Sequence, residues 1–293
     1  MKMKTKHISD YIINGVILLF MIIVLVGVLY PFINAGAISL NDSDDTARGG
    51  ITFYPRVFTL KNYQLIFKNP AILNAYFITI SRTLVGTVTG LLLTGLLSFA
   101  LSHRNLAGRR FYTMMCLIPM YFSGGLIPIY FVIKWLGLVN SFWVYIIPLF
   151  INLWNMILMR TYFQGIPMAL EESARMDGAS YFRVFFQIIM PISTPIMATI
   201  ALYIGVFHWN SWFDAAIYIT RQELKPMQSI LISVISEAKF AERIAETAGG
   251  LGTANMTALN KSQKVNVRSI SMATMFITII PIVTMYPFLQ RYF

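Results

Sequence analysis

Charged residues and cysteine are scarce in this sequence. Only 12% of its 293 residues are charged, whereas soluble proteins carry about 25%. The single cysteine, Cys116, lies within an apolar stretch, so an internal disulfide bond is impossible. Together with an apolar content of 57%, the low charge excludes an ordinary soluble domain and predicts an all-α polytopic membrane protein.

Motifs that bind nucleotides or cleave bonds are also missing. No glycine is followed by lysine, which excludes a P-loop, and the patterns HExxH, CxxC and GxSxG do not occur. A net charge of +11 is typical of nucleic-acid-binding proteins, but no basic cluster is interleaved with aromatics, so the basic residues fit loops at a membrane surface. We expect no catalytic residue, no bound cofactor and no metal ion in this chain.

Six apolar stretches are long enough to cross a bilayer. They cover residues 12–33, 72–101, 111–134, 141–162, 192–219 and 268–292. The third is interrupted by Gly124, Gly125 and Pro128, which a membrane tolerates where neighbouring helices or a water-filled cavity satisfy the freed backbone groups. Six spans put both termini on one side, and the polar residues 34–70 and 220–267 are then extracytoplasmic loops. Loop charge supports this orientation only weakly, because both long loops are also rich in basic residues.

The first 33 residues predict a cytoplasmic N-terminus followed by a membrane anchor. Lys2, Lys4 and Lys6 precede the apolar run, and such lysines stay in the cytoplasm. Ala35-Gly36-Ala37 imitates a signal-peptide cleavage site. The apolar run is, however, about twice the length of a signal-peptide core, which favours the anchor.

Small residues recur along the second span. The series Arg82, Gly86, Gly90, Thr94 and Ser98 falls on one helix face, where another helix can approach closely. An arginine at membrane depth is a candidate functional residue by default, although pairing with a neighbouring helix or snorkelling to the interface also accounts for it.

Residues 163–191 form a charged segment between the fourth and fifth spans. Pro167 fits the first turn of a short helix, and Gly178 is a natural stop because glycine adopts the left-handed cap conformation without steric cost. Ser180 can cap a second helix, Tyr181 to Ile189, which Pro191 ends. The segment therefore predicts a helix–turn–helix.

The spacing of this segment resembles the EAA motif of the permease subunits of bacterial ABC importers. That motif reads Glu-Ala-Ala, three residues, Gly, nine residues, Ile, one residue, Leu-Pro. Here it matches Glu172-Ser173-Ala174, Gly178, Ile188 and Met190-Pro191, with serine and methionine replacing alanine and leucine. Asp177-Gly178-Ala179 is typical of the sugar-importing branch. His208 to Asp214, HWNSWFD, is similar to permeases for complex oligosaccharides, including the smaller permease of alginate-oligosaccharide importers.

The resemblance implies a type I ABC importer permease, multi-pass in a bacterial cytoplasmic (inner) membrane, with both termini cytoplasmic. Its core would cover residues 71–293 with five spans. Residues 163–191 would dock on an ATPase subunit through Glu171, Glu172, Ala174, Asp177, Gly178 and Phe182. ATP and Mg would then be bound by the partner ATPase. Family members usually continue past the equivalent of Phe293 with a short tail that can touch the ATPase.

The implied partners are a second, non-identical permease, two ATPase subunits and an extracytoplasmic solute-binding protein, which residues 220–267 could contact. The implied cargo is an oligosaccharide. Importer cargoes of another kind, such as peptides or other polar solutes, stay open. So does a transporter that works without an ATPase, although the charged segment would then lack a purpose.

Polar and aromatic side chains of the second, fourth and fifth spans are candidates for the sugar pathway. The candidates are Arg82, Asn152, Asn155, Trp209, Asn210, Trp212 and Asp214. Asn152 and Asn155 should share a helix face, with hydrogen bonding between helices as the alternative. For the tryptophans the alternative is an interfacial aromatic belt, and we expect His208 and Asp214 to form a helix-end pair. An anionic uronate would favour Arg82 as a pathway residue.

Overall fold

The computed structural model describes residues 8–236 and 267–290. These ranges are helical and contain no strand, apart from an isolated bridge between Asn41 and Phe58. Lys2, Lys4, Lys6, Phe293 and residues 237–266 of the expected second loop lie outside them. The chain divides into two compact units, one of Met1–Asn69 with Ser233–Ile277 and one of Pro70–Ile232 with Thr278–Phe293.

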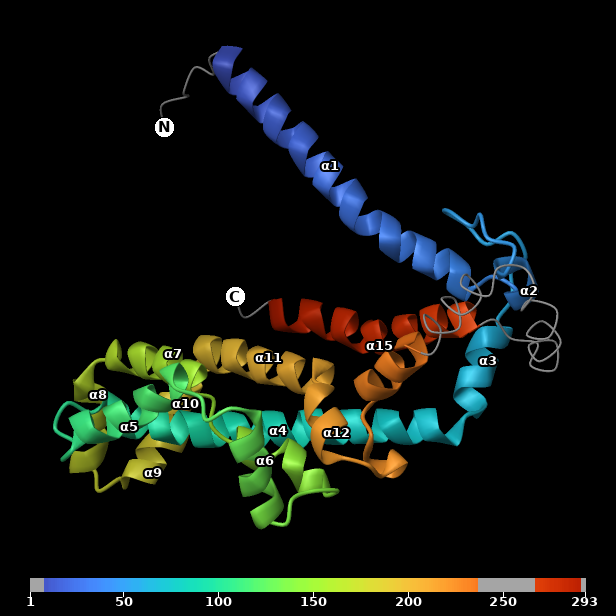
Figure 1. Cartoon of the computed structure of the whole chain (residues 1–293). Coiled ribbons are helices and arrows are strands. Elements are labelled where there is room, and N and C mark those ends of the chain that lie inside the picture. The colour runs from blue at the N-terminus through green and yellow to red at the C-terminus, as the bar shows by residue number, and fades with distance from the viewer. Residues whose placement is uncertain (1–7, 237–266, 291–293) are drawn as a thin grey trace. The chain divides into compact units, whose positions relative to one another are not determined.

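The first unit begins with α1, Ile8–Ser39 (Figure 1). Its stretch Ile12–Ser39 is apolar and long enough to cross a membrane, and nearly all its large side chains are exposed, as suits a helix surrounded by lipid. The helix runs without a break through Ala35-Gly36-Ala37 and so extends past the expected end at Ile33.

The polar segment after α1 folds locally around short helices α2, Ser43–Thr46, and α3, Lys61–Lys68. The buried amide of Asn62 donates to the carbonyl oxygens of Ser39 and Asn41 at 2.9 and 3.0 Å. The segment is therefore more ordered than the simple loop that its polarity suggests, because side-chain amides satisfy its backbone.

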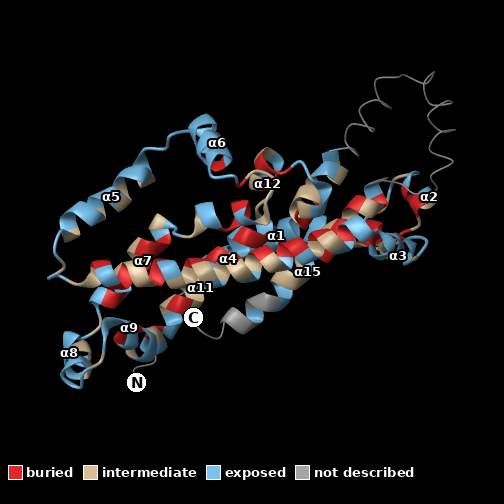
Figure 2. Cartoon of the chain, turned by 90° about the horizontal axis from the view of Figure 1, so that it is seen from below, coloured by how far each residue is buried: buried red, intermediate tan, exposed pale blue. Residues whose placement is uncertain are grey.

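The second unit is built along α4, Pro70–Ser102, which packs against α7, Leu153–Gln164, and α11, Thr194–Asn210. Figure 2 shows buried residues concentrated on these three helices. The expected small-residue face is confirmed: Arg82, Gly86, Gly90, Thr94 and Ser98 are all buried. A Cβ on Gly86 would overlap the ring of His208, and one on Gly90 would lie 3.4 Å from Cδ1 of Ile204.

The third and fourth expected spans are each broken into pieces. Helices α5, Arg109–Tyr121, and α6, Leu126–Trp135, meet at an angle of 119°. The bend falls at the predicted glycines, and Gly125 has a φ of 83° that favours glycine. The fourth begins as 3₁₀ turns η1, Phe142–Tyr145, and η2, Ile147–Leu149, and bends by 45° into α7.

The expected fifth span is not one helix either. After α11 the chain leaves the helix at Ser211 and forms α12, Phe213–Tyr218, followed by η4, Gln222–Leu224. The last described helix is α15, Val267–Gln290. On their own, only Ile12–Ser39 and Pro70–Ser102 reach the length of a span in the described ranges, and three bent pairs raise the number to five. This is compatible with six spans, because α15 is also apolar over Arg268–Thr284.

Candidate coupling site and buried polar centre

The charged segment forms the predicted helix–turn–helix. Its first helix is α8, Met168–Met176, which follows Pro167, and Gly178 occupies the turn with a φ of 82°. Ser180 caps α9, Tyr181–Val184, by accepting a hydrogen bond from the backbone N–H of Arg183. The cap and the turn glycine therefore act as their residue types predict, whereas Pro167 is the residue before the helix rather than part of its first turn.

The expected end of the second helix at Pro191 is wrong. After α9 the chain makes a π-helical turn, η3, Phe185–Ile189, and continues as α10, Met190–Ile192. In the π turn the N–H of Met190 bonds to the carbonyl of Phe185, so the hydrogen-bond pattern shifts by one residue just before the proline. The sharp bend of 89° instead follows at Ser193 and leads into α11.

Exposure sorts the predicted docking residues into an outward and an inward set. Glu172, Asp177 and Phe182 are exposed, Phe182 by 67%. Ala174 instead packs on an apolar cluster whose centre includes the fully buried Phe185. Met176, which sequence analysis did not select, is the most exposed apolar residue of the segment at 88%. The outward face thus combines two carboxylates with two unpartnered apolar side chains.

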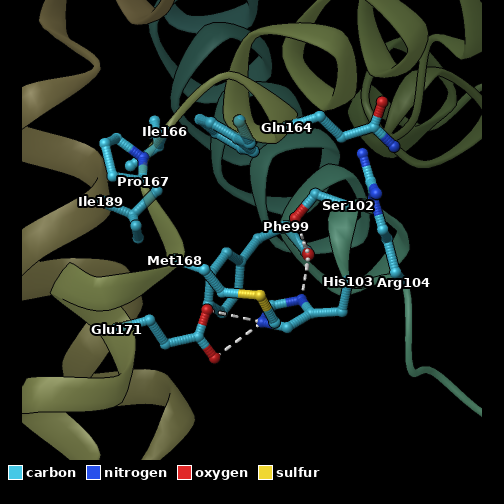
Figure 3. A pocket seen from close by; sticks show the side chains of 11 residues that line it. Phe99, Ser102, His103, Arg104, Gln164, Ile166, Pro167, Met168, Glu171 and Ile189 are labelled. Atoms are coloured by element: carbon cyan, nitrogen blue, oxygen red, sulfur yellow. Dashed lines mark hydrogen bonds and ion pairs between the residues drawn. The ribbon is translucent and has the colours of Figure 1, made fainter.

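Glu171 turns inward, toward the end of α4 (Figure 3). Both of its carboxylate oxygens lie 2.8 Å from Nε2 of His103, and Nδ1 of His103 lies 2.8 Å from the carbonyl oxygen of Phe99. The pair borders a cavity of about 290 Å³, also lined by Ser102, Pro167 and Met168. Sequence analysis did not select His103, because a contact across 68 residues leaves no local signal.

A second polar centre lies in the middle of α4. Arg82 is fully buried and forms an ion pair with Asp214, Nη2 to Oδ2 2.5 Å. Its guanidinium also donates to the carbonyl of Ser211 at 3.2 Å and lies 4.2 Å from the ring centre of Tyr145. The structure therefore brings two of the predicted pathway residues together. Of the alternatives given for Arg82, it shows pairing with a neighbouring helix.

The expected pair of His208 and Asp214 is not formed. Asp214 accepts hydrogen bonds from Arg82, from the Ser211 hydroxyl and from the backbone N–H of Ala215. His208 is 1% exposed and lies against Gly86, where the absence of a side chain leaves room for its ring. Arg82 takes the carboxylate because a buried guanidinium needs a counter-charge, whereas a neutral imidazole does not.

The other pathway candidates lie at several places, although the backbone N–H of Asn155 donates to Oδ1 of Asn152 at 3.0 Å. Asn152 and Asn155 do not share a helix face, because α7 begins only at Leu153; Asn152 is the exposed N-cap and Asn155 is buried. Trp209 is buried and donates from Nε1 to the carbonyl of Thr278, 3.1 Å away. Asn210 and Trp212 remain open, with Trp212 exposed by 41%.

Among the described residues, no three His, Cys, Asp or Glu side chains lie close enough to hold a metal ion. The site consists of the capped, partly apolar helix–turn–helix near one end of α4 and the buried ion pair of Arg82 and Asp214 along the same helix. Together with the long apolar helices, these features fit a helical membrane protein.

Comparison with known proteins identifies the class. Residues 86–293 match the family described as "Binding-protein-dependent transport system inner membrane component". The polygalacturonan/rhamnogalacturonan transport system permease protein YtcP of Bacillus subtilis is 32% identical over 288 residues, which cover 98% of this chain and 96% of that protein. Protein LplC of the same organism is 34% identical, with 90% and 86% covered.

A solved structure agrees with this assignment. It is a crystal structure of a bacterial ABC transporter involved in the import of the acidic polysaccharide alginate, with a TM-score of 0.85 and 27% identity over 99% of this chain and all of that one. The chain belongs to the family of inner membrane components of binding-protein-dependent transport systems. It has the type I ABC importer permease fold, and as such a component it is a transport subunit.

Proposed function

We propose that this chain is the permease subunit through which an acidic oligosaccharide, alginate-like or pectin-like, enters the cell. The observation that carries the proposal is a double similarity along nearly the whole chain. One relative is named for polygalacturonan and rhamnogalacturonan transport. One solved structure is of a transporter involved in the import of the acidic polysaccharide alginate. Polygalacturonan and alginate are both polymers of uronic acids, so a carboxylated sugar chain is the shared chemistry.

The outward face of residues 163–191 is the proposed docking surface for a cytoplasmic ATPase. Glu172 and Asp177 offer charge, and Phe182 offers apolar area to a groove on the partner. Gly178 sets the angle between the two helices, and Ala174 fixes the element on the apolar cluster. Closure of the ATPase dimer on ATP and Mg then moves α8 and α9 and rocks the spans.

The complete importer combines this chain with a second homologous permease, two ATPase subunits and a solute-binding protein. In the proposed topology residues 1–33 form the cytoplasmic N-terminus and anchor, residues 34–70 an extracytoplasmic loop, and residues 71–293 the permease core. Both termini are cytoplasmic, and residues 220–267 face the binding protein. The charged docking element supports this orientation, since it must lie on the ATPase side.

Exposure divides the proposed pathway residues by role. Asn152, Asn210 and Trp212 are open enough to touch sugar directly, with the indole face against its CH surfaces and the amides on its hydroxyls. The others are buried, or largely covered in the case of Asp214, and would shape the pathway rather than grip the sugar: Arg82, Asn155, Trp209 and Asp214.

The test uses the complex assembled with its own partner subunits in nanodiscs. ATP hydrolysis is measured with the solute-binding protein presented with oligogalacturonate, alginate oligosaccharide, neutral arabino-oligosaccharide or a short peptide. We expect one of the two acidic ligands to stimulate hydrolysis several-fold over the unloaded binding protein. Stimulation by the neutral sugar or the peptide alone contradicts the proposed cargo.

A further inference from the structure

We propose that His103 is a positioning residue for coupling, and that it acts as a protonated bridge between the end of α4 and α8. The inference rests on the proposed function, in which α8 and α9 receive movement from the ATPase. It assigns a role to a side chain that is not part of the EAA spacing. The argument starts from the atoms around the imidazole ring.

Both nitrogens of His103 face atoms that accept hydrogen bonds. Nδ1 lies 2.8 Å from the carbonyl oxygen of Phe99, and Nε2 lies 2.8 Å from each carboxylate oxygen of Glu171. A neutral imidazole carries one N–H and leaves one of these contacts without a proton, whereas an imidazolium donates to both. The geometry therefore requires one proton more than a neutral His103 and an ionised Glu171 carry together.

The position of His103, directly after the last residue of α4, favours the positive charge. The helix ends at Ser102, and the carbonyl of Phe99 lies in its last turn, where it also accepts a hydrogen bond from the Ser102 hydroxyl at 2.7 Å. A cation that donates to such a carbonyl both caps the helix and meets the negative end of its dipole. Glu171 adds a full counter-charge, and both side chains are sheltered, with 16% and 12% of their surface exposed.

The ring also contacts α9, the second helix of residues 163–191, the proposed coupling segment. His103 stands edge-on between Phe99 and Tyr181, with ring centres 4.7 and 5.9 Å away. Tyr181 is held in turn by Arg175, whose Nη1 lies 2.7 Å from the phenolic oxygen. One side chain at the end of α4 thus touches α8 through Glu171 and α9 through Tyr181.

This bridge gives the coupling segment a polar, directional attachment to α4. The apolar cluster around Phe185 also joins these parts, but such packing permits sliding, whereas a charge-assisted bond to two carboxylate oxygens fixes one orientation. Because α4 packs along both α7 and α11, a movement of α8 that α4 follows reaches most of the second unit.

A double-mutant cycle in the assembled complex tests the bridge. His103→Ala and Glu171→Ala should each lower cargo-stimulated ATP hydrolysis and uptake by about tenfold, the scale of a lost charge-assisted hydrogen bond. The double variant should fall no further, because the two residues act as one unit. Losses that multiply in the double variant overturn the proposal.

Two variants at one position separate charge from shape. His103→Lys keeps a cation with several donors, and His103→Gln keeps similar length without charge. The lysine variant should retain clearly more stimulated activity than the glutamine variant, at equal recovery of assembled complex. Equal activity of the two refutes the protonated bridge.

A failure of the bridge is distinguishable from a failure of the docking assignment. Glu172→Ala removes a neighbouring exposed carboxylate that the bridge does not use. If Glu172 and Phe182 variants lose stimulation while His103→Ala keeps it, the docking surface stands and the bridge is wrong. If none of these variants affects stimulation, the docking surface itself is wrong.

Discussion

Arg82 of α4 and Asp214 of α12 form an ion pair, although they are 132 positions apart in the sequence. Asp214 lies just after the interruption between helices α11 and α12. The guanidinium has no exposed surface, and it also bonds to Ser211, where α11 has just ended. The pair therefore holds the unwound residues between α11 and α12 against the middle of α4.

Removing the cation should strongly destabilise the second unit. Arg82→Met leaves the Asp214 carboxylate without its partner, which costs about 3–5 kcal/mol for a buried pair. Thermal unfolding of the purified complex measures this loss. Arg82→Met combined with Asp214→Leu should recover part of it, and Arg104→Met at an exposed arginine serves as the control. A double variant no more stable than Arg82→Met would show that the pair is not the cause.

Gly86 should not tolerate a methyl group. The Cβ of Gly86→Ala would overlap the His208 ring, and overpacking of this kind costs about 1–3 kcal/mol. Gly90→Ala on the same face meets Ile204 at 3.4 Å and should be milder. The second change His208→Ala should restore the stability of Gly86→Ala, as judged by recovery after heating. If it does not, the close packing of Gly86 and His208 is not what limits this position.

Gly178→Pro should separate insertion from transport. The φ of Gly178 is +82°, which proline cannot adopt, because its ring fixes φ near −65°. We expect normal amounts of protein in the membrane but no uptake and no stimulation of ATP hydrolysis. Gly178→Ala, strained but permitted, should show an intermediate loss. Uptake that survives in Gly178→Pro contradicts the coupling role of this turn.

The segment after α1 should loosen in acid. A hydrogen bond from Asn41, assisted by Arg56, lowers the pKa of Asp45 in the folded protein. A carboxylate with a lowered folded pKa contributes stability above its unfolded pKa, and that contribution is lost as the pH falls through the folded value. Limited proteolysis of residues 41–58 with an acid-active protease should therefore accelerate below about pH 4. The Asp45→Asn variant should be cleaved faster than the unchanged protein already above pH 4, within the protease's working range, and should show a weaker acid effect.

Local spacing predicted the parts of the fold that local geometry decides. The four-residue series from Arg82 to Ser98 identified the packed face of α4, since side chains at that spacing must share a face. Ser180 and Gly178 predicted the cap and the turn of residues 163–191, because one residue is enough to set each conformation. The membrane helices at Ile12–Ser39 and Pro70–Ser102 followed from length and composition.

Other features depend on partners far away in sequence. The inward turn of Glu171 required knowledge of His103, and the place of Asp214 required knowledge of Arg82. Glycines marked the break in the third span, but the breaks in the fourth and fifth spans leave apolarity unchanged, so composition merges their pieces into single helices. The helix expected to end at Ile189 because of Pro191 instead passes through a π turn and ends at Ile192, one residue after the proline.

The central claim is that the outward face of residues 163–191 docks on an ATPase subunit. Because Cys116 is the only cysteine, Cys116→Ser gives a background in which single cysteines can be placed. Met176→Cys puts a thiol at the most exposed apolar position of the segment, and Tyr54→Cys, at a residue 72% exposed, is the control in the proposed extracytoplasmic loop. A short photoactivated crosslinker on the thiol is then tested in the transport-competent complex. The account predicts crosslinking to the ATPase subunit from position 176 and none from position 54, and an uncrosslinked position 176 would contradict it.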